Sequence, residues 1–387
     1  MDDDQRRLGC QPEPMGMDGR LAARCRQLND EPLLHVSLGS KELFHSNLIG
    51  WMCERFPDES LRVLLHWLRP AEQVIASVQR EYKHLDLVVR FPGFAPVVVE
   101  NKMFALPDAA QLRGYMDGAV KAIVPQPTLV LLSLTDPGWP DDRLTVDGRT
   151  WVHASWRELA QRLRTQFAGR SDFGAQLLAH EAQLIDLLYR AIDEVSVKSD
   201  DELFLLPAST TNLLRGVRIA DAVGKTRGHQ VMRRILDQYQ AHGIVPTWTE
   251  VGLTNGTPLM SAYWKKDEAG NAVGWQCQGN QWRLAMILKT MSGRGDGPGG
   301  ARAAYAASQS GWFEFEPLCQ ILEARDRDLR PEGGKTPLDG FNKYDPDFVY
   351  RYRRLPTHTP VGRIIDLAVV YGQAAATWTF DPPPPQS

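Results

Sequence analysis

Three charged residues lie inside two short runs of the chain that are otherwise apolar. Asp86 falls within LDLVVRF, and Glu100 and Lys102 fall within VVVENKMF. Burying a charge is costly unless the charge is paired or binds a metal ion. Because side chains alternate along a strand, Glu100 and Lys102 share one face and Asn101 points to the other. If the two runs pair, Asp86 lies near Glu100, and two convergent carboxylates form the oxygen site that Mg²⁺ prefers.

The elements that must position these residues alternate between helical and extended patterns. Apolar residues at three- and four-residue spacing predict helices, and short runs rich in β-branched residues predict strands. Ser155 and Glu158 form a capping box at the start of one helix. The predicted helices cover 41–56, 59–68, 107–123, 156–167 and 173–193, and the predicted strands cover 74–82, 85–91, 96–104, 127–135 and 150–154.

This order predicts an α/β fold with a mixed central sheet flanked by helices. An acidic residue followed after a gap by E-x-K, in the order helix, three strands, helix, strand, strand, helix, resembles the PD-(D/E)XK nuclease superfamily and its restriction-endonuclease-like core. The resemblance covers about residues 40 to 165. It implies that Asp86, Glu100 and the backbone carbonyl of Asn101 hold Mg²⁺, with Mn²⁺ as a substitute. It also implies that Lys102 orients or deprotonates the attacking water.

A second element supports the resemblance. Gln111 and Tyr115 match the Q-x-x-x-Y element of the RecB-type branch, and a helix places them on one face. Two features depart from the family pattern, because Leu85 stands where a proline is typical and the G-x-x-x-x-H-x-x-D element is absent. Glu42, on the first predicted helix, is either a further metal ligand, as in many members of the superfamily, or a plain exposed glutamate.

Other motif-like patterns are interpreted as structural. Pro57-Asp58 followed by Glu81-Tyr82-Lys83 fits the literal nuclease motif, but Asp58 lies between two helical stretches, where an N-cap is the simpler interpretation. Gly224-Lys225-Thr226 and Gly334-Lys335-Thr336 are reminiscent of a P-loop but lack its earlier glycine.

Length and composition predict two domains without a membrane anchor. The chain has 387 residues and a net charge of −3, so nucleic-acid binding requires local basic patches. Five scattered cysteines without a CxxC pair indicate reduced thiols and a cytoplasmic protein. We expect a disordered leader at 1–30, a nuclease-like domain at 31–198, a mixed α/β domain at 199–379 and a proline-rich tail at 380–387.

Aromatic and basic residues are interleaved in the second half of the chain. They form either a stacking and phosphate-binding surface or aromatic core positions with ordinary solvated charges. A hairpin turning at Gly279-Asn280 is expected, and YRYRRLP, from Tyr350, is a further basic candidate. The interleaved residues are Trp248, Tyr263, Trp264, Trp275, Trp282, Trp312, Lys265, Lys266, Arg283, Lys289 and Arg294.

The function expected from the resemblance is Mg²⁺-dependent hydrolysis of phosphodiester bonds in DNA. Family analogy alone extends this to restriction or anti-phage defence, with a homodimer or a defence-system protein as the partner. The alternative is a catalytically inactive module of the same fold that binds nucleic acid or protein. The presence of Asp86, Glu100 and Lys102 together favours the enzyme.

Overall fold

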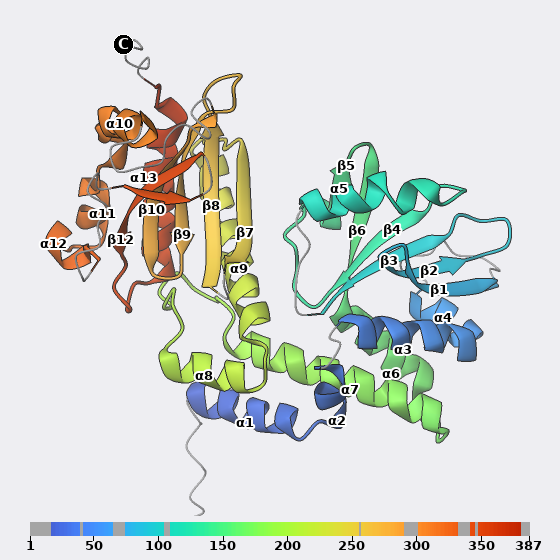
Figure 1. Ribbon diagram of the computed structural model, residues 1–387. Coiled ribbons are helices and arrows are strands. Elements are labelled where there is room, and N and C mark those ends of the chain that lie inside the picture. Colours follow the sequence, from blue (N-terminus) through green and yellow to red (C-terminus); the bar gives the residue numbers. More distant parts are fainter. Residues whose placement is uncertain are drawn as a thin grey trace, which may run out of the picture.

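The computed structural model describes residues 17–38, 42–64, 74–103, 109–254, 257–289, 301–331, 341–344 and 347–380. The first 16 residues, the glycine-rich loop SGRGDGPGG, the Gly334-Lys335-Thr336 segment, Arg294 and residues 381–387 of the tail lie outside these ranges. Two six-stranded sheets stand apart, β1–β6 on the right and β7–β12 on the left of Figure 1.

The first sheet is mixed, with strand order β1-β2-β3-β4-β6-β5. β1, β2 and β3 are antiparallel, β3, β4 and β6 are parallel, and β5 is antiparallel to β6. The expected element order is confirmed with one addition, because β5 was not predicted. Its four residues, RLTV, are too few to show a clear alternation. The strands are β1 Ser77–Tyr82, β2 Leu85–Arg90, β3 Val97–Lys102, β4 Thr128–Ser133, β5 Arg143–Val146 and β6 Arg149–Ser155.

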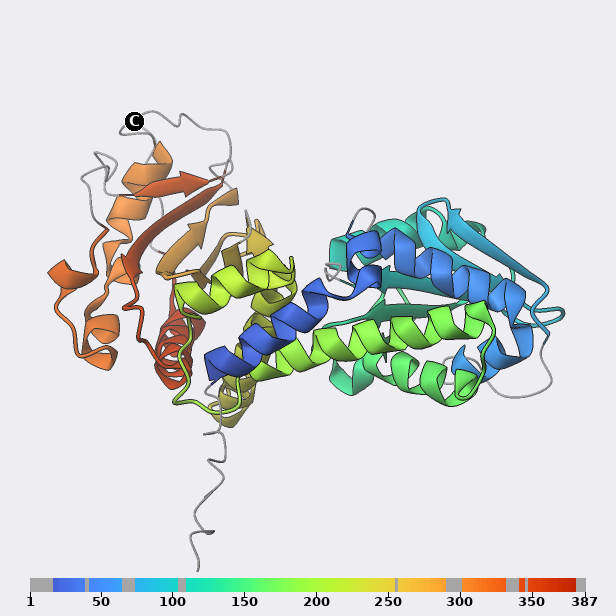
Figure 2. The ribbon, with the colours of Figure 1, turned by 90° about the horizontal axis from the view of Figure 1, so that it is seen from below.

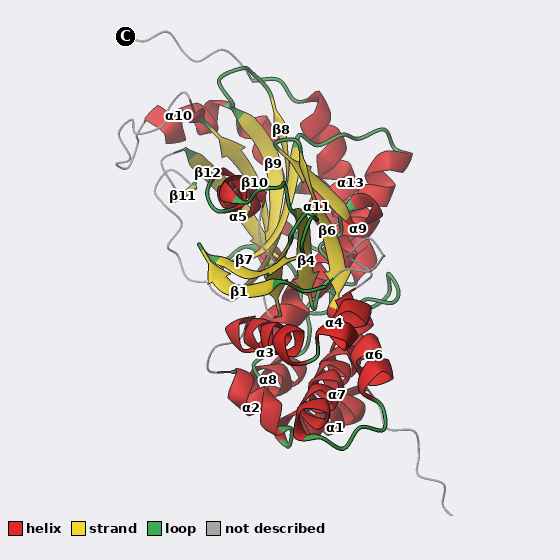
Figure 3. Cartoon of the chain, turned by 90° about the vertical axis from the view of Figure 1, so that its right-hand side faces the viewer, coloured by secondary structure: helices red, strands yellow, loops and turns green. Residues whose placement is uncertain are grey.

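Helices cover both faces of this sheet, so both faces of β3 and β4 are buried. On one face α5 (Ala109–Asp117) and the 3₁₀ turn η1 (Val120–Ala122) pack on Val98, Leu129 and Leu131. The opposite face carries the larger core, and Figure 3 shows its helical layer below the strands. That layer contains α3 Glu42–Arg55, α4 Pro57–Leu64, α6 Trp156–Phe167 and α7 Phe173–Glu194.

The predicted disordered leader is wrong for residues 17–29, which form helix α1 (Met17–Asn29). Leu21, Cys25 and Leu28 are buried at helical spacing, and a short helix α2 (Pro32–Ser37) follows. Figure 2 shows α1 alongside α7, and α1 also packs on α8. This segment is mostly polar, and its narrow apolar stripe is buried only because α7 and α8 pack against it.

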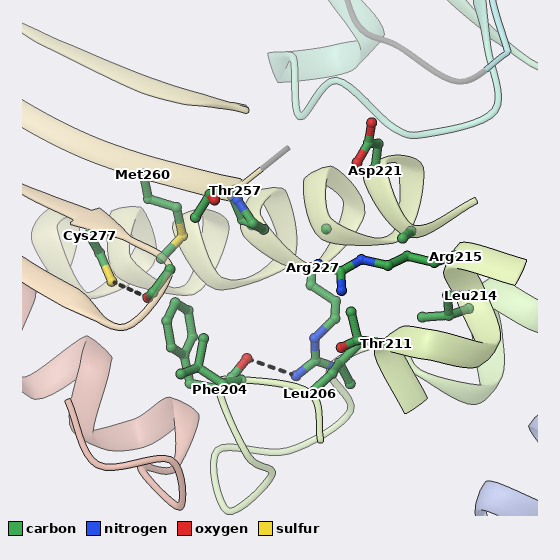
Figure 4. Close-up of a pocket in the computed structure, with 16 residues that line it drawn as sticks. Phe204, Leu206, Thr211, Leu214, Arg215, Asp221, Arg227, Thr257, Met260 and Cys277 are labelled. Atoms are coloured by element: carbon green, nitrogen blue, oxygen red, sulfur yellow. Dashed lines mark hydrogen bonds between the residues drawn. The ribbon is translucent and has the colours of Figure 1, made fainter. Parts of the chain in front are cut away.

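A buried arginine links the segment that follows α7 to the long helix that packs on the second sheet. After α8 (Ala208–Gly216) comes α9 (Ala220–Ala241), and Arg227 of α9 donates to the carbonyls of Val195, Leu203 and Phe204. Burial lowers the pKa of Arg227 to about 10. Figure 4 shows this guanidinium beside a cavity of about 290 Å³ between α8, α9 and the second sheet. Arg227 therefore replaces missing backbone partners in the connecting segment.

The second sheet is antiparallel throughout, in the order β11-β12-β10-β9-β8-β7. The predicted turn at Gly279-Asn280 is confirmed between β9 and β10, and Gly279 has a φ of 55°, which glycine adopts without strain. The strands are β7 Trp248–Thr254, β8 Thr257–Lys265, β9 Ala272–Gln278, β10 Gln281–Ile287, β11 Asn342–Tyr344 and β12 Phe348–Arg354. The remaining helices are α10 Ala301–Ser308, α11 Glu316–Ile321, α12 Asp326–Leu329 and α13 Val361–Thr377, with 3₁₀ turns η2 Pro140–Asp142 and η4 Ser310–Phe313.

The aromatic residues of the second half divide between the two sides of this sheet. Trp264, Trp275, Trp282 and Trp312 are buried in the core that α9 and α13 form with one face. Trp248 and Tyr263 lie on the other face. In the basic run YRYRRLP, Arg353 pairs with Asp326 and lies over the ring of Phe315, which is a structural role. None of the described helices has the length and apolar character needed to cross a membrane.

A buried hydrogen bond between His45 and Glu181 links α3 to α7. His45 Nδ1 lies 2.6 Å from Glu181 Oε1, and both side chains are almost fully buried. Removing one partner leaves the other buried without compensation. We expect Glu181→Ala to lower the free energy of unfolding by about 2–4 kcal/mol, measured by urea denaturation.

Asp193→Ala on the same helix is the matched control. Asp193 pairs with Arg157 at the surface, so we expect a loss below about 1 kcal/mol. Equal losses in the two variants would contradict the structural role of the buried pair.

Candidate functional site

The candidate site begins where β2 and β3 diverge. Their register ends at the pair Leu87 and Val99, and beyond it the backbone N–H of Asn101 donates to Asp86 Oδ2 at 2.7 Å. The Asp86 side chain thus replaces the strand acceptor that the ladder no longer supplies. The carbonyls of Pro96 and Lys102 accept from the amides of Thr128, in β4, and Leu134, directly after it. The alternate residue Asn101 therefore turns its carbonyl toward the β2 side. Leu85, which stands where the PD-(D/E)XK pattern has a proline, is fully buried in the core beneath α5.

The side chain of Asn101 points away from the site and holds three elements together. Its Nδ2 donates to the Glu42 carbonyl at 2.8 Å and to Ser46 Oγ at 3.0 Å, while its Oδ1 accepts from Trp156 Nε1 at 2.9 Å. The amide group is therefore fully used between α3, β3 and α6. The predicted alternation of Asn101 with Glu100 and Lys102 is confirmed.

Glu100 is the centre of the site on the opposite face. Its Oε1 accepts from Lys102 Nζ at 2.8 Å and from the Tyr115 hydroxyl at 2.8 Å. Gln111 Nε2 donates to the Tyr115 hydroxyl at 2.9 Å, so both residues of the Q-x-x-x-Y element reach the site. The other oxygen, Glu100 Oε2, is buried and accepts no hydrogen bond from the described residues.

Burial and mutual repulsion dominate the electrostatics of the two carboxylates. Burial raises the pKa of Asp86 to about 7, and the charge of Glu100 adds to the effect. Burial also raises the pKa of Glu100 against the opposing influence of Lys102. For Lys102, burial lowers the pKa, but the neighbouring carboxylates outweigh it and raise the pKa above its usual value. Burial and the charge of Glu100 raise the pKa of Tyr115, so its hydroxyl stays protonated and can donate.

The oxygen atoms of this site fit a divalent cation that prefers oxygen ligands. Glu100 Oε2 lacks a partner, Asp86 has a second oxygen, and the carbonyl of Asn101 faces the same side. Bringing a cation to two carboxylates with raised pKa values would relieve both burial and repulsion. Glu42 lies near enough for its charge to raise the pKa of Asp86. Its role as a further ligand stays a prediction.

A second polar group lies on the same face, two strands away. Cross-strand pairing places Glu100 of β3 and His153 of β6 level with Leu131 between them. In the described part of the chain, Asp136, Asp142 and His153 are the one group of three acidic or histidine residues whose ligand atoms all lie within 4.8 Å of one another. His153 bonds to Asp142 Oδ1 and Ser133 Oγ, and Asp136 pairs with an arginine of α9.

Helix α9 brings cationic and imidazole side chains to this face of the first sheet. Arg233 Nη2 donates to Asp136 Oδ2 at 2.6 Å, and His229 lies beside Gly138 in the loop after β4. Lys225 lies one turn earlier, near enough for the charges of Glu42 and Lys102 to shift its pKa. At four-residue spacing, Lys225, His229 and Arg233 form one stripe, which we call the α9 stripe.

The α9 stripe was not predicted. Gly224-Lys225-Thr226 lies within the helix, which confirms that it is no P-loop. Its spacing was readable, but nothing in the sequence shows which sheet it faces. The rejected motif residues Asp58 and Glu81 are both exposed, in the first turn of α4 and at the end of β1.

Comparison of the chain with protein-family models, with curated proteins and with solved structures finds no match. The geometry of the site therefore carries the functional argument.

The α9 stripe yields a prediction for the pH dependence of stability. Burial lowers the pKa of His229 to about 4; the charge of Asp136 opposes this shift, and the charges of Lys225 and Arg233 add to it. The stabilising contribution of neutral His229 is complete above the unfolded value of about 6.5 and is lost as pH falls toward 4. Between pH 7.5 and pH 5, we expect the wild type to lose about 2 kcal/mol more unfolding free energy than His229→Gln.

Urea denaturation at both pH values measures the difference. His242→Gln, at the exposed end of the same helix, is the control and should follow the wild type. An identical pH dependence for His229→Gln and the wild type would show that His229 is not buried against these cations.

Proposed function

We propose that the chain is a Mg²⁺-dependent nuclease with a PD-(D/E)XK core, acting on phosphodiester bonds in DNA. The observation that carries the proposal is that the two carboxylate oxygens of Glu100 differ in their hydrogen bonds. Lys102 and Tyr115 both donate to Oε1, which leaves the buried Oε2 with no hydrogen-bond partner among the described residues. An unpartnered buried carboxylate oxygen is costly unless it has a ligand.

Asp86, Glu100 and the Asn101 carbonyl would hold the ion. A Mg²⁺ ion held there would supply Lewis-acid chemistry, neutralising the charge that develops on the scissile phosphate. Asn101 keeps these donors in place, because its own side chain is bonded to α3 and α6.

Lys102 has the position required to act on the nucleophile or on the phosphate. Its ammonium group has three hydrogens, and its bond to Glu100 uses one of them. The remaining hydrogens can orient a water molecule or bind a phosphate oxygen. Tyr115 keeps its proton and holds Glu100, and Gln111 fixes the direction of the Tyr115 hydroxyl.

The α9 stripe would contact the backbone of the nucleic acid beside the scissile bond. Lys225 is partly buried near Lys102, and burial lowers its pKa. A phosphate would compensate its charge, as phosphate contacts do in nucleic-acid complexes. Nuclease action in defence, with a homodimer or a partner protein, stays a prediction from family analogy.

Substitution of Glu100 tests the proposal. We expect Glu100→Gln to reduce Mg²⁺-dependent cleavage of plasmid and single-stranded DNA by about 100-fold or more, because the ion loses its most buried ligand. Glu81→Gln, in the competing E-x-K pattern, is the matched control and should retain full activity. Mg²⁺ should also raise the melting temperature of the wild type but not of Glu100→Gln.

Equal activity of Glu100→Gln and the wild type would refute the assignment. The absence of cleavage by the wild type over DNA and RNA substrates would favour the inactive module instead.

Lys225 gives a separate prediction about substrate binding. In a Glu100→Gln background, Lys225→Ala should weaken binding of duplex DNA and reduce the slope of log K against log salt concentration by about 1. Lys265→Ala, an exposed lysine at the end of β8, should leave the slope unchanged. An unchanged slope for Lys225→Ala would remove α9 from the substrate path.

A further inference from the structure

The face of the second sheet that is not packed on α9 and α13 carries a wide cavity of about 660 Å³. This face is turned toward the viewer in Figure 1, where the two helices lie behind the strands. The cavity combines aromatic rings with amide, cationic and carboxylate side chains. Residues that line it include Trp248, Tyr263, Phe348, Tyr350, Gln276 and Arg283.

The aromatic part of the cavity is arranged as a stacking platform. Trp248 on β7 lies directly opposite Tyr263 on β8, and the rings stack with centroids 5.0 Å apart and an interplanar angle of 23°. Tyr263 is only 3% exposed and is supported at its edge by Phe348, whereas Trp248 is 38% exposed. Trp248 is therefore held from one side and accessible from the other. An exposed indole in this setting can stack on a flat ligand.

The polar part of the cavity contains Arg283, whose hydrogen bonds go to neutral amides, while Glu250 and the Lys289–Asp347 pair lie elsewhere in the lining. Arg283 Nη1 donates to Gln276 Oε1 at 2.7 Å, and its Nε and Nη2 donate to Gln281 Oε1 at 3.0 and 2.6 Å. The guanidinium lies 4.6 Å from the centre of the Tyr350 ring. Among the described residues, no carboxylate forms an ion pair with it. Neutral amides thus fix its plane but leave its charge uncompensated.

This charge decides the class of ligand. Stacking surfaces suit nucleobases, sugars and methylated ammonium groups alike, but a partly buried guanidinium held only by neutral amides favours an anion beside it. A nucleotide unites a flat base with a phosphate, and base stacking on aromatic side chains together with cationic contacts is the general mode of single-strand recognition.

We propose that this cavity binds an unpaired nucleotide of single-stranded nucleic acid, with the base on Trp248 and a backbone phosphate at Arg283. The proposal relies on the proposed function for the identity of the polymer, yet it uses no residue of the first site. The second sheet would then grip a single strand while the first sheet carries the cleavage site.

Binding of labelled oligonucleotides to the full-length Glu100→Gln protein in chelator tests the proposal by fluorescence anisotropy. Trp248→Ala should weaken binding of single-stranded oligo(dT) by about 10-fold or more, since stacking contributes about 1–3 kcal/mol per base. Binding of a duplex should be unchanged. Phe173→Ala, which removes an exposed aromatic residue from α7, should bind both ligands as the parent does.

Arg283→Ala provides a second measurement, the salt dependence of binding, which would not change if Arg283 had only a structural role. It should reduce the slope of log K against log salt concentration for oligo(dT) by about 0.7. Equal oligo(dT) affinity for Trp248→Ala and the parent would overturn the proposal. So would competition by a neutral oligosaccharide but not by a mononucleotide.

The two proposals fail separately. Cleavage that depends on Glu100, together with oligo(dT) binding that ignores Trp248, would refute only the cavity. Binding that depends on Trp248 in a protein that cleaves neither DNA nor RNA would support the cavity and refute the nuclease assignment.

Discussion

The hydrogen bonds of Asn101 are the constraint on which the first sheet and its helices depend. Its side chain joins β3 to α3 and α6, and its backbone N–H binds Asp86 where the β2–β3 ladder ends. Because side chains alternate along a strand, fixing Asn101 toward the helices directs Glu100 and Lys102 to the opposite face. The packed core and the candidate site are thus two consequences of one residue's orientation, and neither can shift without the other.

The second constraint is the sharing of α9 between the two halves of the chain. One face of this helix packs on the second sheet through Val231, Met232 and Ile235. Another face carries the α9 stripe to the first sheet, where Arg233 meets Asp136. Since a helix is rigid over this length, the polar surface around Glu100 and Lys102 is built from residues of both halves. Sites between such units commonly bind ligands, because each unit supplies one wall.

The burial of two neighbouring carboxylates, Asp86 and Glu100, is consistent with a functional site. Natural proteins keep most buried polar groups hydrogen-bonded, and His45 with Glu181 forms one such bond beneath α3. At the candidate site two neighbouring carboxylates are buried together, and burial raises the pKa of both Asp86 and Glu100. In the second sheet, Arg283 is a partly buried cation whose hydrogen bonds go to neutral amides. Local conflicts of this kind concentrate where a ligand completes the structure.

The sequence by itself determined the features that depend on near neighbours. Strand alternation placed Glu100 and Lys102 on one face, helical spacing joined Gln111 to Tyr115, and the Gly279-Asn280 turn followed from backbone conformation. Only the tertiary structure decided that α1 packs on α7, that Lys225 approaches Lys102, and which aromatic residues are core. Trp248 and Trp264 both lie in strands of the second sheet, yet Trp264 is buried in the core on one face and Trp248 lies on the other. Local periods are set by backbone geometry, whereas the identity of a distant partner depends on which surfaces the whole chain can bury together.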